Sequence, residues 1–84
     1  MYYVYILRCR DETLYTGITT DVERRAAVHN RGKGAKYTRS RLPVTVVYRE
    51  PQPDKSAALK RELEIKGLTR DQKLCLIASK PQTP

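Results

Sequence analysis

The sequence predicts a small α+β domain in which a three-stranded antiparallel sheet is flanked by three helices, in the order ββαβαα. Strand-like apolar segments come first, and helix-start signals precede the later amphipathic segments. The chain has 84 residues, which is enough for one thin core. We therefore expect a single domain over residues 1–79 and a loose C-terminal tail over residues 80–84.

The strands are expected, in chain order, at residues 2–9, 14–19 and 44–50. The first is apolar on both faces, which is typical of a central strand covered on both sides. A polar turn at 10–13 joins it to the second strand. We predict that Tyr5 and Tyr15 project from one face of this hairpin. Because side chains alternate along a strand, that requires an odd-numbered loop or a bulge.

The helices are expected from 21 to 30, from 54 or 56 to 66, and from 69 to about 79. Thr20 with Glu23, and Thr69 with Gln72, match the capping-box pattern that begins a helix. Gly67 occupies the position just past a helix end that favours glycine. These signals define the helical half of the domain.

Charge is the first indication of function. The formal net charge is +8, and the sequence pI is about 9.8. Between Arg24 and Arg41 there are seven basic residues and no acidic one. A basic cluster of this kind is typical of a polyanion binder, and it favours nucleic acid over anionic lipid.

Composition also limits compartment and partners. The two cysteines, Cys9 and Cys75, have neither a disulfide-framework nor a metal-ligand spacing, which indicates a reducing cytoplasm. No apolar run approaches the length of a membrane span, so no membrane partner is expected. We predict a cytoplasmic protein (bacterial cytoplasm or nucleoid) that is a monomer or a weak dimer.

Two helices place polar residues on apolar faces. Val22, Arg25, Ala26 and His29 share an arc of the first helix at about 100° per residue. Arg25 is therefore either part of a site or an arginine that extends its head to water. His29, one turn further on, suits proton handling or phosphate contact.

On the second helix Ala58, Leu59 and Ile65 mark the predicted buried face, and Glu62 falls within it. A carboxylate there is costly unless it binds a metal or forms an ion pair, for which Arg25 and Lys66 are the candidates.

The segment between the first helix and the third strand is a candidate phosphate-binding loop. Its glycines, Gly32 and Gly34, allow close approach of the backbone to a phosphate. Its cations would supply a salt-sensitive grip, and its tyrosine could stack on a base. A solvated connection is the alternative. The candidate nucleic-acid-binding residues are Arg31, Lys33, Lys36, Tyr37, Arg39 and Arg41.

These residues together resemble the GIY-YIG nuclease domain, most closely its small stand-alone bacterial members. Tyr3-Val4-Tyr5 is similar to the first tripeptide of that family and Tyr15-Thr16-Gly17 to the second. The resemblance extends from Tyr2 to about Ile77. It departs from the family pattern at Tyr3, Thr16 and Ile18, which replace a glycine, an isoleucine and the lysine of the excision-repair branch. The asparagine that some members carry after the metal-binding glutamate has no clear equivalent.

The resemblance implies a metal-dependent DNA endonuclease or nickase, acting in repair or recombination. It implies that Glu62 holds one Mg²⁺ or Mn²⁺, that Arg25 neutralises charge on the phosphoryl group, and that a tyrosine helps to orient or deprotonate the attacking water. The implied catalytic set is Tyr5, Tyr15, Arg25, His29 and Glu62. DNA is the expected partner, and RNA stays open.

Two rival functions remain at this point. A nucleic-acid-binding module with this fold and little or no cleavage would use the same basic loop, with Glu62 in an ion pair. A basic adaptor for an acidic protein would account for the charge, but not for Glu62 or the tyrosines.

Overall fold

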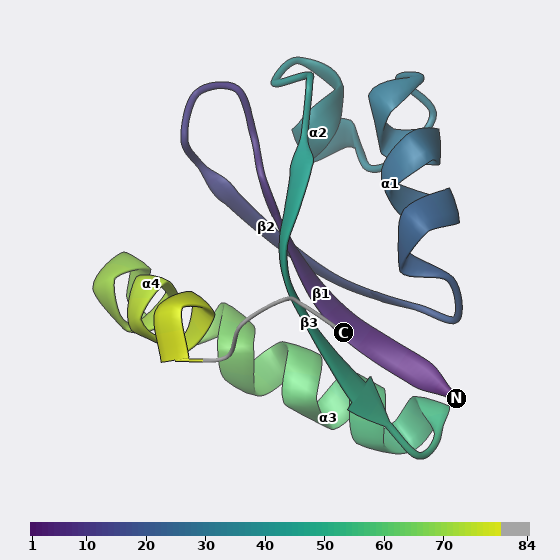
Figure 1. The fold of residues 1–84 in the computed structure, drawn as a ribbon, viewed down its shortest axis with the longest axis vertical. Helices are drawn as coiled ribbons and strands as arrows, with labels where there is room; N and C mark the ends of the chain where they lie inside the picture. The colour runs from purple at the N-terminus through teal and green to yellow at the C-terminus, as the bar shows by residue number, and fades with distance from the viewer. Residues whose placement is uncertain (80–84) are drawn as a thin grey trace.

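The computed structural model describes residues 1–79 and confirms the predicted α+β class. Three antiparallel strands, β1 (Tyr2–Arg8), β2 (Leu14–Thr19) and β3 (Thr45–Gln52), form one sheet in the order β2-β1-β3 (Figure 1). The predicted tail at 80–84 lies outside the described residues. Within the described part of the chain no helix is long and apolar enough to cross a membrane. The helices are α1 (Val22–Asn30), α2 (Lys36–Arg39), α3 (Lys55–Lys66) and α4 (Arg70–Ser79).

The register of the hairpin places both tyrosines on one face, as predicted. Leu7 pairs with Tyr15 and Tyr5 pairs with Gly17, so these four side-chain positions face the same way. The connecting loop, residues 9–13, has an odd number of residues and turns through Glu12 at φ 71°. The alternation of side chains along β1 therefore decides which residues can meet at the site.

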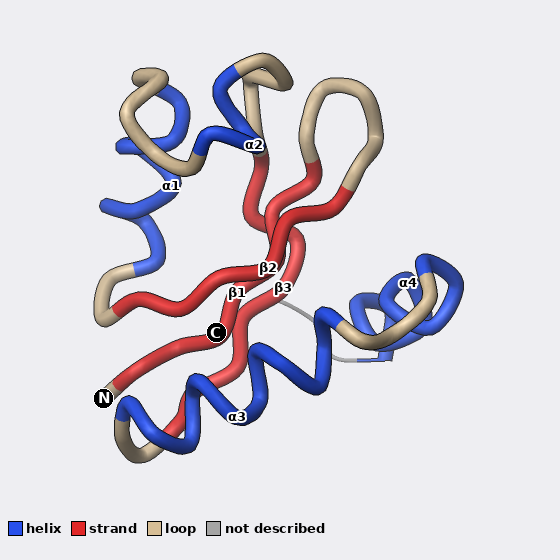
Figure 2. The backbone as a smooth tube through the Cα atoms, turned by 180° about the vertical axis from the view of Figure 1, so that it is seen from behind, coloured by secondary structure: helices blue, strands red, loops and turns tan. Residues whose placement is uncertain are grey.

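A separate apolar cluster covers each face of the sheet. Val4 and Ile6 of β1 pack with Ala58 and Ile65 of α3 on one face. On the other face Tyr5, Leu7, Cys9 and Val44 pack with Val22 of α1. Figures 1 and 2 both place α1 and α2 together and away from α3 and α4, with the strands between them. The predicted central strand is thus covered on both sides.

Helix starts follow the predicted signals with one correction. The N-cap of α1 is Asp21, whose carboxylate accepts from the amide of Arg24, so the capping box predicted at Thr20 is wrong. An aspartate one residue later offers a charged acceptor at the positive end of the helix. The other capping box is confirmed, because Thr69 and Gln72 bond reciprocally at 2.9 and 3.2 Å.

The helical turn α2 was not expected from the sequence. It occupies the middle of the predicted loop, and its N-cap, Ala35, makes no side-chain capping bond. Four residues carry too little periodicity to be recognised, and only Thr38 is buried. The turn matters because it presents Thr38 to α1.

The buried face of α3 differs from the prediction at Leu59, and Arg61 of the same helix contacts the sheet. Arg61 donates from Nε to Glu50 of β3 at 2.9 Å, and Glu50 also accepts from the Tyr48 hydroxyl. Leu59, expected to be buried, is 43% exposed. Glu50 on β3 is only 9% exposed, and a buried carboxylate is stable only when a cation is paired with it. Arg61 supplies that cation and therefore turns toward the sheet.

Candidate active site

Tyr5 and His29 form the centre of the candidate site. The Tyr5 hydroxyl lies 3.2 Å from His29 Nε2, although β1 and α1 are far apart in sequence. Tyr5 is 2% exposed and His29 is fully buried. The second ring nitrogen, Nδ1, lies 2.8 Å from the hydroxyl of Thr38 on α2. Both ring nitrogens of the histidine therefore have a partner.

Two glycines leave room for this pair. A β-carbon at Gly17 would lie 2.7 Å from the Tyr5 hydroxyl oxygen, and one at Gly34 would lie 2.3 Å from His29 Nδ1. Neither distance is compatible with a side chain unless the aromatic ring moves. The glycine that ends the second tripeptide is thus required by close packing against the tyrosine of the first.

The pKa of the Tyr5 hydroxyl connects residues from four elements. Burial raises it above its ordinary value, and electrostatic interaction with Tyr15 and with the Glu62 carboxylate raises it further. Contact with the Arg25 guanidinium acts in the opposite direction. The predicted catalytic residues therefore lie within electrostatic reach of one hydroxyl group.

The surroundings of His29 favour its neutral form. Burial lowers its pKa, and the positive charge of Arg25 lowers it further. A neutral imidazole has one nitrogen that can accept a proton, which a charged imidazolium lacks. His29 is thus chemically suited to act as a base.

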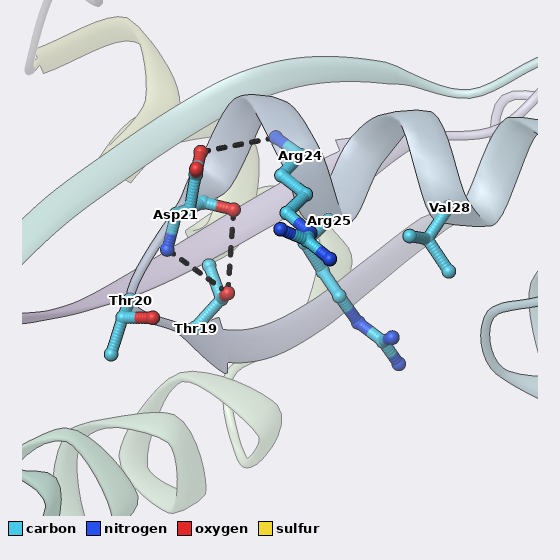
Figure 3. Close-up of a pocket in the computed structure, with 6 residues that line it drawn as sticks. All are labelled: Thr19, Thr20, Asp21, Arg24, Arg25 and Val28. Atoms are coloured by element: carbon cyan, nitrogen blue, oxygen red, sulfur yellow. Dashed lines mark hydrogen bonds between the residues drawn. The ribbon is translucent and has the colours of Figure 1, made fainter.

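Arg25 lies in an open pocket at the start of α1. The pocket is lined by Thr19, Thr20, Asp21, Arg24, Arg25 and Val28 (Figure 3). Arg24 and Val28 line this pocket with Arg25, although they lie outside the helix arc that Arg25 shares with His29. Tyr5, Tyr15 and Glu62, which the resemblance implies as catalytic, do not belong to this lining. The site therefore comprises a buried tyrosine–histidine pair beside an arginine-rich opening.

Glu62 is only 15% exposed and forms an ion pair with Lys66, Nζ to Oε2, at 3.2 Å. One of the two ion pairs considered from the sequence is thus present. The pair uses one carboxylate oxygen and a half-exposed lysine one turn away. Among residues 1–79 no group of three or more His, Cys, Asp or Glu residues could hold a metal ion.

Tyr15 and Tyr37 extend the aromatic surface outward from His29. The Tyr15 ring lies 5.3 Å from the His29 ring and stacks on Tyr37 at 6.0 Å. The Arg41 guanidinium lies 4.1 Å from the centre of the Tyr37 ring. Tyr37 is 40% exposed, so it retains an accessible edge.

Arg41 differs from the other cations of the predicted phosphate-binding loop. Its guanidinium bonds Asp11 at 3.1 Å and the Tyr37 carbonyl at 2.7 Å, so it joins α2 to the β1–β2 loop. We predicted phosphate binding by Arg41, but these contacts already use its Nε and Nη1 donors. The other four cations are exposed and form no ion pair with another described residue: Arg31, Lys33, Lys36 and Arg39.

Sequence reasoning overlooked Thr38 and the packing roles of Gly17 and Gly34. Thr38 lies in a basic segment where a threonine attracts no attention, and its partner is nine residues away. The only signal in the sequence was the position of the two glycines: Gly17 ends the second tyrosine tripeptide, and Gly34 lies in the basic loop. Their steric role depends on which ring lies opposite them, and that follows from the fold.

Comparison with known proteins gives a family match and several similar chains. Residues 1–74 match the family model described as the GIY-YIG catalytic domain. A UPF0213 protein of Staphylococcus haemolyticus is 58% identical over 76 residues, covering 90% of this chain and 93% of that protein. A UPF0213 protein of Natronomonas pharaonis is 60% identical over 77 residues, covering 92% of this chain and 91% of that protein.

Two solved structures share the fold. The solution NMR structure of a UPF0213 protein from Bacillus halodurans superposes with a TM-score of 0.63 at 48% identity, covering 98% of this chain and 88% of that one. The solution NMR structure of a protein from E. faecalis superposes with a TM-score of 0.61 at 40% identity, covering 99% of this chain and 92% of that one. The fold is thus shared with these two proteins.

Proposed function

The chain belongs to the GIY-YIG family of nucleases, and we propose that it is a divalent-metal-dependent endonuclease or nickase that hydrolyses phosphodiester bonds in DNA. The observation that carries this proposal is the contact between the Tyr5 hydroxyl and Nε2 of a neutral, buried His29. A role in DNA repair or recombination is part of the proposal. A single site cuts one strand, so double-strand cleavage would need a dimer or two separate events.

Water activation begins with a proton relay. As a water attacks the phosphorus, its proton passes to the Tyr5 oxygen while the Tyr5 proton passes to His29 Nε2. Free tyrosine, with a pKa near 10, is a poor base at neutral pH. A neutral imidazole that takes the phenolic proton removes the need for a standing tyrosinate.

Arg25 affects both the His29 imidazole and the phosphoryl group of the substrate. Its positive charge disfavours the imidazolium that the relay produces, as the lowered His29 pKa indicates. A bound phosphate would neutralise that charge, so proton uptake by His29 becomes easier when substrate is present. The same guanidinium stabilises negative charge that develops on the phosphoryl group. The relay is therefore coupled to substrate binding.

The donor set suits a hard cation held partly by substrate. Glu62 Oε1 forms no hydrogen bond with another described residue, whereas Oε2 contacts Lys66. Mg²⁺ is typically bound by one or two carboxylates, substrate phosphate oxygens and water, so one carboxylate is sufficient. The metal, Mg²⁺ or Mn²⁺, would stabilise charge on the scissile phosphate and the leaving oxygen. Glu62 would hold it, and Lys66 would release the carboxylate.

Metal-dependent cleavage by the wild type and by Glu62→Gln tests the function. The substrates are nicked, branched and single-stranded DNA, with and without Mn²⁺. We expect wild-type cleavage only with metal, and a decrease of at least about 100-fold in Glu62→Gln with unchanged DNA affinity. Glu64→Gln is the control, since Glu64 is exposed and pairs with Arg61. Cleavage by Glu62→Gln at the wild-type rate would exclude Glu62 as the metal ligand.

A nucleic-acid-binding module with little or no cleavage is the second candidate. The Glu62–Lys66 ion pair favours it, because a paired carboxylate needs no metal. In that case the wild type binds DNA through its basic loop and yields no product with either metal. The cleavage assay separates the two functions directly.

A further inference from the structure

Thr38 lies outside the two family tripeptides, and its contacts support an inference about the candidate site. It is fully buried in a four-residue helix, yet its hydroxyl contacts the candidate catalytic histidine. We propose that Thr38 is a positioning residue that holds His29 in the tautomer protonated at Nδ1, which leaves Nε2 free to accept the Tyr5 proton. The inference deepens the proposed function and rests on it for its catalytic consequence.

The Thr38 hydroxyl has a single proton to donate. Its oxygen lies 2.9 Å from the carbonyl oxygen of Ala35, which can only accept, so the hydroxyl donates there. The contact with His29 Nδ1 at 2.8 Å must then be made by an N–H that donates to the Thr38 oxygen. Nδ1 is therefore the protonated nitrogen.

The protonation state of Nε2 follows from the number of protons that a neutral imidazole carries. A neutral imidazole carries one N–H, so a proton on Nδ1 leaves a lone pair on Nε2. The Tyr5 hydroxyl, 3.2 Å away, then donates to that lone pair. In the opposite tautomer Nε2 would carry a hydrogen, and it could not take a proton from Tyr5.

The neutral state on which this count depends is supported by the surroundings of His29. The groups that face its ring are the Tyr5 hydroxyl, the Tyr15 ring and the Thr38 hydroxyl, and none of them is a carboxylate. Arg25, nearby on the same helix, adds a positive charge. A second proton on the imidazole is therefore disfavoured.

The backbone fixes the orientation of the Thr38 hydroxyl. The Thr38 amide donates to the same Ala35 carbonyl at 3.1 Å, and the Arg41 amide donates to the Thr38 carbonyl at 2.9 Å. Gly34 packs against the His29 ring itself. The turn α2 therefore presents a fixed acceptor to Nδ1, a function that requires a hydroxyl at 38 and no charge.

The tautomer can be observed without any mutation. His29 is the only histidine in the chain, so a tag-free protein labelled with nitrogen-15 in histidine gives signals from one ring. At about pH 8, above the ordinary histidine pKa of about 6.5, we expect the proton on Nδ1. A proton on Nε2, or on both nitrogens, would overturn the proposal.

Variants at position 38 test the catalytic consequence. Thr38→Val removes the acceptor with little change of shape, and we expect kcat to fall about 100-fold with KM unchanged. The NMR signals should show loss of the Nδ1–H preference. Thr38→Ser keeps the hydroxyl and should restore both tautomer and rate. Thr45→Val, at an exposed strand position, is the control and should match the wild type.

The outcomes separate this inference from the proposed function. If the wild type cuts no DNA but shows the Nδ1–H tautomer, which Thr38→Val loses, the function fails and the tautomer assignment stands. If the wild type cuts DNA and Thr38→Val retains both kcat and its pH profile, the positioning role is wrong. If Thr38→Val does not fold, Thr38→Ser and the wild-type tautomer still decide the question.

Discussion

At position 17 the side chain must be a single hydrogen, because the Tyr5 hydroxyl occupies the space that a β-carbon would need. The packing of β2 against β1 therefore positions the Tyr5 hydroxyl. The same relation holds between Gly34 and His29. At the residue scale, the site is built by small residues opposite large rings as much as by the groups that react.

Gly17→Ala should therefore displace the Tyr5 hydroxyl. We expect a stability loss of about 1–3 kcal/mol from overpacking, measured by urea unfolding. The cleavage rate of the folded variant should fall as the Tyr5–His29 contact is lost. Gly67→Ala is the matched control, because a β-carbon there meets only ordinary contacts at 3.5 and 3.6 Å. Wild-type cleavage by Gly17→Ala would show that Tyr5 need not contact His29.

At the element scale, the segment between α1 and β3 combines two functions. Its buried side, through Thr38, contacts His29. Its exposed side carries Lys33, Lys36 and Arg39, and Arg41 anchors it to Asp11. The candidate phosphate-binding surface therefore belongs to the same segment as Thr38, which contacts His29.

Removing loop charges should weaken DNA binding without regard to sequence. For the triple variant of Lys33, Lys36 and Arg39 to alanine, we expect lower affinity and a logarithmic salt slope reduced by up to about 3, or about 1 per phosphate contact. Titrations at several salt concentrations measure both quantities. The double variant of the two lysines should show a smaller effect.

A matched double variant of Lys55 and Lys60 to alanine is the control for this experiment. Both lysines are exposed on α3, which packs on the sheet face opposite α1. We expect a smaller change in its affinity and salt slope than in the Lys33 and Lys36 double variant. Equal effects would mean that binding follows total charge and that the loop is a solvated connection.

At the scale of the whole molecule, the burial of His29 links global stability to pH. Because its pKa is lowered in the folded state, the unfolded chain binds a proton first as pH falls. Stability is therefore complete above about pH 6.5, the ordinary histidine value, and decreases below it at no more than about 1.4 kcal/mol per pH unit from this residue.

Thermal unfolding between about pH 5 and 8 tests this linkage. We expect the melting temperature of the wild type to fall as pH drops below about 6.5, and His29→Gln to lose that dependence. Carboxylates titrate mainly below this window, so they contribute little to the difference between the two proteins. An identical pH dependence in both would show that His29 is not held neutral in the folded state.

The sequence by itself determined the α+β class, the approximate positions of the three strands and the three longer helices, the shared face of Tyr5 and Tyr15, and the location of the positive charge. Alternation, capping and composition are local properties, so they can be read along the chain. The tertiary structure alone decided that Thr38 meets His29, that Arg61 turns to Glu50, and that Arg41 is used internally. These contacts join segments distant in sequence, and a buried polar group takes whichever partner the packing of those segments brings within reach.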